Sequence, residues 1–222
     1  MILVLGVTAS GKARLGFELA KFLDGEIISV DSMKVYRRMD IGTAKASHEA
    51  QRQIPHHLID VVEPSESFSV GLYVDKALAA IDDIRSRGKA VVAVGGTALY
   101  IKALLYGLFD GPGSDEMIRA ELRAQAHRDG TAKLHEALRQ IDPKTAGRID
   151  PNDAKRIIRA LEVYQLTGKP ISSFQKQFDA QKPMHDWTIL GLRREKAEES
   201  RRMNARVKKM IELGLVEEVR SL

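Results

Sequence analysis

The first half of the chain alternates short, mostly apolar runs with longer amphipathic stretches. Apolar runs bounded by glycine or charged residues are typical of strands buried in a parallel sheet. The amphipathic stretches place apolar residues three and four positions apart, as in helices that cover a sheet. The runs lie at residues 2–5, 26–30, 58–62 and 90–94, and the helical stretches lie at residues 12–23, 71–86 and 98–105. This order predicts an α/β fold with a parallel sheet flanked by helices.

The pattern changes at residues 111–114, a Gly-Pro-Gly-Ser segment. From there to about Pro183 no convincing strand occurs, and helical periodicity is interrupted by Asp-Pro and Gly-Lys-Pro. The helical stretches lie at residues 115–128, 131–140 and 152–167, and an apolar run at residues 187–192 indicates a strand that returns to the sheet. We therefore predict a discontinuous α/β core, residues 1–112 and 186–222, with a helical insertion at residues 113–185.

The composition excludes several classes of protein. A chain of 222 residues with 44% hydrophobic residues can bury a sizeable core, which excludes a disordered protein. No apolar run approaches the roughly 20 residues of a membrane helix, and the start lacks the features of a secretory signal. The absence of cysteine excludes disulfides, thiolate zinc sites and cysteine nucleophiles. We expect a cytoplasmic protein without a membrane partner, and the net charge of +5 weakly favours an anionic one.

Residues 6–13 carry the G-x-x-x-x-G-K pattern of a phosphate loop, between the first predicted strand and the first predicted helix. Glycines let backbone amides turn toward a phosphate, and the N-terminus of the helix adds positive potential. Lys12 supplies a further charge. A plain glycine turn with an exposed Lys12 is the alternative, but the position between strand and helix favours phosphate binding.

Ala13 stands where this pattern normally has the Ser or Thr whose hydroxyl ligates magnesium. A bound ion then has to be held by Thr8, Ser10, a water molecule or Asp31, unless the metal matters less here or the site is impaired. The loop thus supports diphosphate binding and weakens the case for a standard ATPase or kinase.

Two further segments end at the same predicted sheet edge, where ligands of open α/β sheets bind. Asp31 and Ser32 follow the second strand, and Gly95-Gly96-Thr97 follow the fourth. A carboxylate at Asp31 is suited to accept a proton or to hold a hydrated metal, but a helix cap at Asp31 or Ser32 is equally well supported. For Thr97, a strand-to-helix turn with a capping hydroxyl is at least as well supported as a ligand contact.

His56 and His57 suggest a metal site, but adjacent residues on an extended chain point in opposite directions. No cysteine or carboxylate cluster accompanies them. We therefore assign no residue as a metal ligand.

Several segments of the chain together resemble the tRNA dimethylallyltransferases, and the resemblance covers essentially the whole sequence in order. The segments are residues 6–12 (GVTASGK), 27–36 (IISVDSMKVY), 39–45 (MDIGTAK), 54–60 (IPHHLID), 94–97 (VGGT), 151–153 (PND) and 156–163 (RIIRALEV). The resemblance implies transfer of a dimethylallyl group from its diphosphate to N6 of the adenine 3′-adjacent to the anticodon in tRNA. It also implies a P-loop core with a parallel sheet and an inserted helical subdomain, bound Mg²⁺ and a monomer.

The resemblance further implies a role for individual residues. Catalysis would involve Asp31, which accepts the proton of N6, and Thr97, which helps to hold the extruded adenine. The donor diphosphate would lie against Gly6, Val7, Thr8, Ala9, Ser10, Gly11, Lys12 and Ala13. The tRNA would meet Asp31, Ser32, Met33, Lys34, Thr97, Arg119, Lys155, Arg156, Ile157, Ile158 and Arg159. Without the resemblance, the arginines of this set would be taken for a solvated helix face. One of Arg201, Arg202 and Arg206 is a further candidate for the diphosphate.

The sequence differs from the usual pattern of the family at four positions. Ala13 replaces a hydroxyl, and Lys34, Val7 and Ala98 stand where Gln, Pro and Gly are common. Lys34 exchanges a base-edge amide for a phosphate-binding charge, which puts base discrimination in doubt. The family normally continues with further helices after Leu222, so we expect a shortened member or a fragment with weaker tRNA binding.

Three other functions remain as alternatives at this stage. Prenylation of free AMP, ADP or ATP uses a related core, but the helical insertion and residues 156–159 favour a polymeric acceptor. A small-molecule kinase shares the loop, and Ala13 argues against it. A tRNA- or diphosphate-binding relative with impaired activity would bind without turnover.

Overall fold

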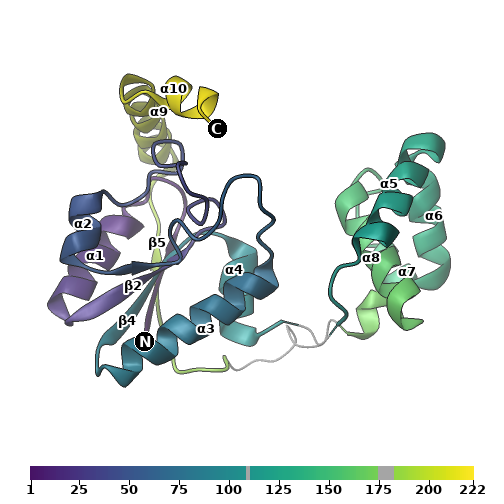
Figure 1. Cartoon of the computed structure of the whole chain (residues 1–222), viewed down its shortest axis with the longest axis horizontal. Coiled ribbons are helices and arrows are strands. Elements are labelled where there is room, and N and C mark those ends of the chain that lie inside the picture. Colours follow the sequence, from purple (N-terminus) through teal and green to yellow (C-terminus); the bar gives the residue numbers. More distant parts are fainter. Residues whose placement is uncertain (109–110, 175–182) are drawn as a thin grey trace. The chain divides into compact units, whose positions relative to one another are not determined.

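The apolar runs of the sequence form a five-stranded parallel sheet (Figure 1). The computed structural model describes residues 1–108, 111–174 and 183–222. The strands are β1 (Ile2–Gly6), β2 (Gly25–Val30), β3 (His56–His57), β4 (Ala90–Gly95) and β5 (Thr188–Leu192), in the order β3-β2-β4-β1-β5. Ile2 of β1 pairs with Val92 of β4 and with Thr188 of β5, so the strand that follows the helical segment does return to the sheet. The predicted α/β class is confirmed.

Helices cover both faces of this sheet. The connections are α1 (Lys12–Phe22), α2 (His48–Gln53), α3 (Val70–Ser86) and α4 (Ala98–Tyr106). The chain crosses the sheet in one direction from β1 to β2 and in the opposite direction from β3 to β4, and right-handed crossovers therefore place α1 and α3 on opposite faces. Gly16 lets α1 approach the sheet closely, because a Cβ there would lie 2.3 Å from Val94 Cγ2. Among the described residues no helix is both long and apolar enough to cross a membrane.

The predicted strand at residues 58–62 is wrong. The strand of this region is β3, and the chain after it turns at Leu58 (φ 64°) and Asp60 (φ 55°), both in the left-handed region. Left-handed residues break the extended run that the apolar pattern suggested. Instead, the amide of Asp60 donates to the carbonyl of Lys34 and that of Val61 to the carbonyl of Val35, so this segment holds the loop after β2.

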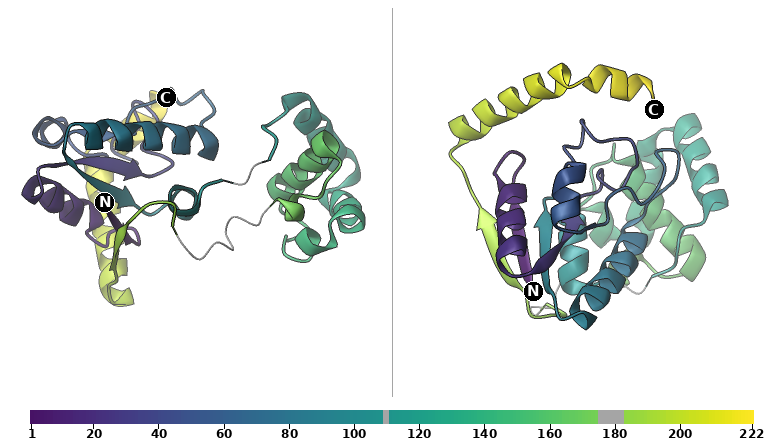
Figure 2. Two further views of the ribbon diagram at one scale, coloured as in Figure 1. Left: turned by 90° about the horizontal axis from the view of Figure 1, so that it is seen from below. Right: turned by 60° about the vertical axis from the view of Figure 1, so that its left-hand side comes forward.

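Two helices that the sequence analysis did not assign follow β5. They are α9 (Lys196–Glu212) and α10 (Leu215–Arg220), joined at Gly214 with φ 97°. Figure 2 shows them as an arm that runs over the carboxyl ends of the strands. The basic stretch after β5 therefore belongs to the sheet edge where the phosphate loop lies.

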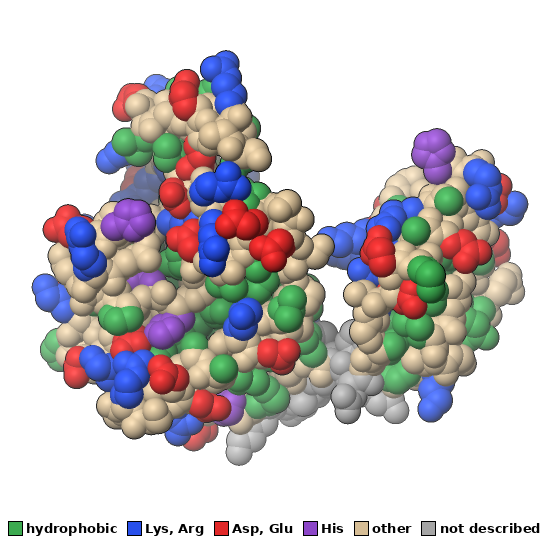
Figure 3. All heavy atoms as spheres, in the orientation of Figure 1, with side chains coloured by type: hydrophobic (Ala, Val, Ile, Leu, Met, Phe, Trp, Pro, Cys, Tyr) green, Lys and Arg blue, Asp and Glu red, His purple; other side chains and the backbone are tan. Residues whose placement is uncertain are grey.

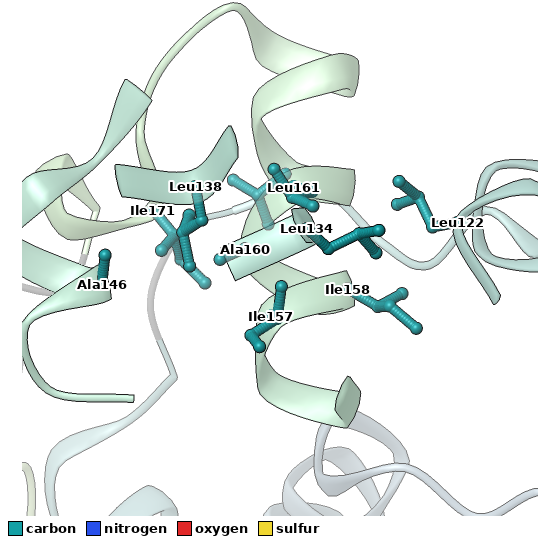
Figure 4. Packing of buried hydrophobic residues seen from close by; sticks show 10 residues of the cluster. Leu122, Leu134, Leu138, Ala146, Ile157, Ile158, Ala160, Leu161 and Ile171 are labelled. Atoms are coloured by element: carbon teal, nitrogen blue, oxygen red, sulfur yellow. The ribbon is translucent and has the colours of Figure 1, made fainter. Parts of the chain in front are cut away.

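The chain divides into two compact units. One is Met1–Gly107 with Lys182–Leu222, which holds the sheet, and the other is Leu108–Gln181. The second unit contains α5 (Glu116–Asp129), α6 (Thr131–Ile141), α7 (Pro143–Ala146), α8 (Ala154–Thr167) and a 3₁₀ turn at Ile171–Ser173. Its own core packs α8 against α5 and α6 (Figure 4), with Ile157, Leu134 and Leu138 almost fully buried.

A buried carboxylate stabilises the sheet at the start of β2. Glu26 is 2% exposed and accepts hydrogen bonds from both terminal nitrogens of Arg87, while His57 Nε2 lies 2.7 Å from Glu26 Oε2. The hydrogen bond from Arg87 lowers the pKa of Glu26 to about 2; burial opposes this and His57 adds to it. A group whose pKa is depressed in the folded state stabilises the fold above its unfolded pKa, and the contribution is lost as pH falls through the folded pKa.

We expect Glu26→Gln to lower the free energy of unfolding by about 2 kcal/mol at neutral pH, because it removes a charged hydrogen-bond acceptor. The value is modest because the Arg87 side chain is 41% exposed and therefore screened. Between the ordinary glutamate pKa near 4.5 and about 2, the wild type should lose stability with falling pH more steeply than the variant. Urea unfolding across this range measures both, with exposed Glu18→Gln on α1 as the control. Parallel pH profiles of Glu26→Gln and wild type would contradict the assignment.

Candidate active site

The phosphate loop is a tight turn between β1 and α1. Ala9 (φ 63°) and Gly11 (φ 96°) take left-handed conformations, and the amide of Ser10 donates to the carbonyl of Val7 at 3.2 Å. Gly6 has no room for a side chain, since a Cβ there would lie 2.5 Å from Ser10 Oγ. The hydroxyl of Ser10 is itself buried beneath the loop and has no hydrogen-bond partner among the described residues. The glycines of the pattern thus serve the close turn that a phosphate loop requires.

Lys12 lies between the loop and the end of β4. Its Nζ donates to the carbonyl of Val7 at 3.2 Å, and a Cβ on Gly96 would lie 3.7 Å from that Nζ. Burial lowers the pKa of Lys12; the carboxylate of Asp31 opposes the shift, and Arg206 adds to it. A bound anion would restore the charged state that burial disfavours, so the surroundings of Lys12 suit a negatively charged ligand.

Asp31 follows β2 and is fixed by the turn that it begins. Its Oδ1 accepts hydrogen bonds from the amides of Met33 (2.9 Å) and Lys34 (3.3 Å). This turn does not start a helix, so the alternative of a helix cap at Asp31 or Ser32 is wrong. The carboxylate is therefore held in one orientation at the carboxyl edge of the sheet.

Thr97 connects the ends of β2 and β4. It occupies the N-cap position of α4, but its hydroxyl makes no capping hydrogen bond. Instead, Oγ1 accepts from the amide of Ser32 at 3.1 Å and donates to Ser32 Oγ at 3.5 Å. The structure thus brings together Asp31, Ser32 and Thr97, which lie far apart in the sequence.

Two adjoining cavities open at this edge. The loop cavity, of about 430 Å³, is lined by residues 8–13, Asp31, Lys34, Thr43 and Ala44, and by Arg202, Ala205 and Arg206 of α9. The strand-end cavity, of about 500 Å³, is lined by Gly6, Val7, Thr8, Lys12, residues 31–33, Gly96, Thr97, Glu199 and Met203. Thr8, Lys12 and Asp31 line both. A carboxylate therefore lies where a basic cavity meets a second space large enough for a small planar group.

Of the arginines that follow β5, Arg194, Arg202 and Arg206 lie near the phosphate loop. Arg202 and Arg206 line the loop cavity, whereas Arg201 lines neither cavity. Arg201 and Arg202 both pair with Glu198, at 2.8 and 2.7 Å. The sequence analysis missed Arg194, whose Nε donates to the carbonyl of Ser10 at 2.8 Å. Arg194 could have been found from its position two residues after the last predicted strand, because the carboxyl ends of parallel strands lie at the same edge of the sheet as the phosphate loop.

Lys34 belongs to the loop cavity. Burial lowers its pKa; Asp31 opposes the shift, and the charges of Lys12, Arg206 and Lys45 add to it. The neighbouring Met33 is 46% exposed and lines the strand-end cavity. The contact of both residues with tRNA stays a prediction.

In the second unit, two of the predicted tRNA-binding arginines form ion pairs with a buried glutamate. Glu162 is fully buried; Arg119 Nε lies 2.8 Å from its Oε1 and Arg159 Nη1 lies 2.7 Å from its Oε2. The side chains of Ile157 and Ile158 lie in the core of this unit. Lys155 and Arg156, at the start of α8, are exposed. Binding of tRNA by any residue of this set stays a prediction.

Charge on the molecular surface is mixed. Figure 3 shows basic side chains interspersed with acidic ones over the visible face, without one continuous basic patch.

The two adjacent histidines each contact another residue of the chain. His57 pairs with Glu26, and His56 Nδ1 lies 2.7 Å from the carbonyl of Ile54. Both histidines therefore have partners within the protein.

Comparisons with known proteins agree with one another. The model of the family described as IPP transferase matches residues 34–222. The chain is 51% identical to tRNA dimethylallyltransferase 2 of Geotalea uraniireducens over 222 residues, which is the whole chain and 72% of the relative. It is 49% identical to the tRNA dimethylallyltransferase of Geobacter metallireducens with the same coverage.

Solved structures give a matching result. The tRNA isopentenylpyrophosphate transferase of Bacillus halodurans matches the whole chain with a TM-score of 0.66 at 43% identity, and 69% of its own length is covered. A eukaryotic dimethylallyltransferase acting on tRNA matches the whole chain with a TM-score of 0.83 at 30% identity, and 55% of its length is covered.

Proposed function

This chain belongs to the IPP transferase family, and on that basis we propose that it transfers a dimethylallyl group from dimethylallyl diphosphate to tRNA. The acceptor is N6 of the adenine 3′-adjacent to the anticodon, and diphosphate is released. The observation that carries this proposal is the fixed carboxylate of Asp31 at the junction of the two cavities. The names and identity of the relatives support the same reaction.

The loop cavity is the proposed site of the donor diphosphate. Lys12, Arg202 and Arg206 line it and offer positive charge, and the N-terminal end of α1 faces the same space. As the bond between the allylic carbon and its oxygen breaks, negative charge accumulates on the diphosphate. Donors that are already in place stabilise that charge without having to reorganise.

The strand-end cavity is the proposed site of the adenine. The lone pair of N6 is delocalised into the ring, so attack on the allylic carbon is assisted by removal of a proton from nitrogen. We assign the acceptance of this proton to Asp31, because its carboxylate lines this cavity. Thr97, fixed by Ser32, lines the same cavity and would help to hold the base outside the anticodon-loop stack.

The residues of the loop cavity are chemically suited to Mg²⁺. Mg²⁺ is usually held by one or two carboxylates together with water and the phosphates of the substrate, and Asp31 and Thr8 supply a carboxylate and a hydroxyl. When bound, the ion would neutralise part of the charge of the diphosphate. Ser10 is less suited, because its hydroxyl is buried beneath the loop.

A transfer assay tests the proposed function. Unmodified tRNA carrying adenine at the target position is incubated with dimethylallyl diphosphate and Mg²⁺, and the digested RNA is analysed by mass spectrometry. We expect one dimethylallyl group on the adenine 3′ of the anticodon. Free AMP, ADP and ATP are tested alongside, and modification of a free nucleotide in place of tRNA would overturn the assignment of the acceptor. Binding of tRNA without any product would identify an inactive relative.

Ala13 lines the loop cavity in the first turn of α1, so a hydroxyl introduced there would meet the bound ion and the diphosphate. We expect Ala13→Thr to raise the transfer rate at limiting Mg²⁺ by about 10- to 100-fold, because it supplies a further oxygen ligand. The measurement is the transfer rate as a function of Mg²⁺ concentration. Ala13→Val is the matched control, since it has the shape of Thr without the hydroxyl. Equal rates for the Thr and Val variants would rule out a role for the hydroxyl.

A further inference from the structure

A carboxylate from the C-terminal helix is bound by three consecutive backbone amides of the loop after β2. Glu218 of α10 accepts hydrogen bonds from the amides of Asp40 (2.7 Å), Ile41 (2.7 Å) and Gly42 (2.9 Å). These partners lie 176 to 178 residues before it in the sequence. Three converging amides form a strong anion-binding concavity, and here it is filled by the protein itself.

The surroundings of Glu218 complete the contact between α10 and this loop. A Cβ on Gly42 would lie 3.2 Å from Leu215 Cδ1, so the backbone of the loop and the side chain of Leu215 are in close contact here. Burial raises the pKa of Glu218, and the three amides lower it by more, so that the pKa lies below its ordinary value. The carboxylate is therefore charged at neutral pH.

The loop that Glu218 binds is firmly attached to the core. Lys45 at its end is 3% exposed, and its Nζ donates to the carbonyl of Tyr36 at 2.6 Å and to Asp40 Oδ1 at 2.7 Å. Thr43 and Ala44, within the same loop, line the loop cavity. This wall of the cavity is thus anchored independently of α10.

The opposite wall of the loop cavity is carried by the arm of α9 and α10. Arg202 and Arg206 lie on α9, whose start is connected to the phosphate loop through the hydrogen bond of Arg194 to Ser10. The far end of the arm meets the core through Glu218. An arm held at both ends keeps its arginines at a fixed distance from the phosphate loop, whereas an arm held at one end does not.

We propose that Glu218 is a positioning residue that fastens the arm of α9 and α10 across the loop cavity and so sets Arg202 and Arg206 for the donor diphosphate. This inference rests on the proposed function, because it concerns the same cavity. Glu218 lines neither of the two cavities, so it acts through the two arginines.

Glu218→Gln tests this, since the variant keeps the size of the side chain but presents a neutral amide to three donors. We expect the affinity for inorganic diphosphate to fall about tenfold, the size of effect that loss of a charged hydrogen-bond acceptor produces. In turnover the KM for dimethylallyl diphosphate should rise by a similar factor, while the KM for tRNA stays unchanged. Glu217→Gln, at the exposed neighbouring position on α10, is the matched control and should bind diphosphate as the wild type does.

A covalent bridge separates positioning from any other effect of the substitution. The chain has no cysteine, so Gly42→Cys and Leu215→Cys introduce the only thiols, and mild oxidation can join the loop to α10 through a disulfide. The bridge should restore diphosphate affinity to Glu218→Gln. Affinity equal to wild type in Glu218→Gln, or a loss that the bridge does not repair, would overturn the proposal. If the wild type itself does not bind diphosphate, the proposed donor site is wrong, and the proposed role of Glu218 is rejected together with it.

Discussion

Replacing Asp31 with Asn is expected to lower the rate of dimethylallyl transfer by about 10²- to 10⁴-fold, the usual contribution of a general base. Asn keeps an oxygen at the position of Oδ1, which can still accept from the amides of Met33 and Lys34, so the turn after β2 should persist. What is lost is the group able to take a proton from N6. Single-turnover transfer at saturating donor and tRNA measures this step directly.

Two controls assign the loss to chemistry. Asp75→Asn, at an exposed position on α3, should transfer at the wild-type rate. Asp31→Asn itself should still bind inorganic diphosphate in the absence of Mg²⁺, because Lys12 and the phosphate loop are unchanged. A rate within tenfold of the wild type would remove Asp31 as the base and leave it with its structural role in the turn.

The local parts of the site were predictable because each depends on a short stretch of sequence. Apolar runs marked β1, β2 and β4, and the residues that follow a strand of a parallel sheet come to one edge. That reasoning predicts the phosphate loop, Asp31 and Thr97 at this edge of the sheet. It also left open whether Asp31 and Thr97 were helix caps, since capping is decided by hydrogen bonds that a strand pattern does not specify.

The parts that were not predictable depend on contacts between distant segments. The segment at residues 58–62 has the apolar content of a strand, but Leu58 and Asp60 adopt left-handed conformations that composition does not signal for leucine. The hydrogen bonds of Glu218 span more than 170 residues. In the second unit, Arg119 and Arg159 were spaced like a solvated helix face, and only the fold places the buried Glu162 between them.

Lys12→Met is expected to lower transfer by about 10²- to 10³-fold, the range found when one preorganised donor to a developing negative charge is removed. Met has a similar length and no charge, so it should fit the space between the loop and Gly96. Steady-state kinetics and diphosphate titration should both show the loss, because Lys12 faces the donor before and during departure of diphosphate. Lys21→Met, in the last turn of the same helix, is the control and should have no effect.

The dependence of donor binding on pH offers a second, independent test of Lys12. Burial depresses the pKa of Lys12 in the free protein, and the negative charge of a diphosphate beside it raises that pKa. Donor binding therefore takes up a proton when the pH lies between the pKa of Lys12 in the free protein and its higher pKa in the complex, so affinity must fall as pH rises across that interval. Lys12→Arg stays charged throughout and should flatten this fall, after allowance for titration of the diphosphate itself in both proteins. Identical pH profiles for wild type and Lys12→Arg would mean that Lys12 is not in contact with the donor, because a charge next to the diphosphate cannot titrate without changing its affinity.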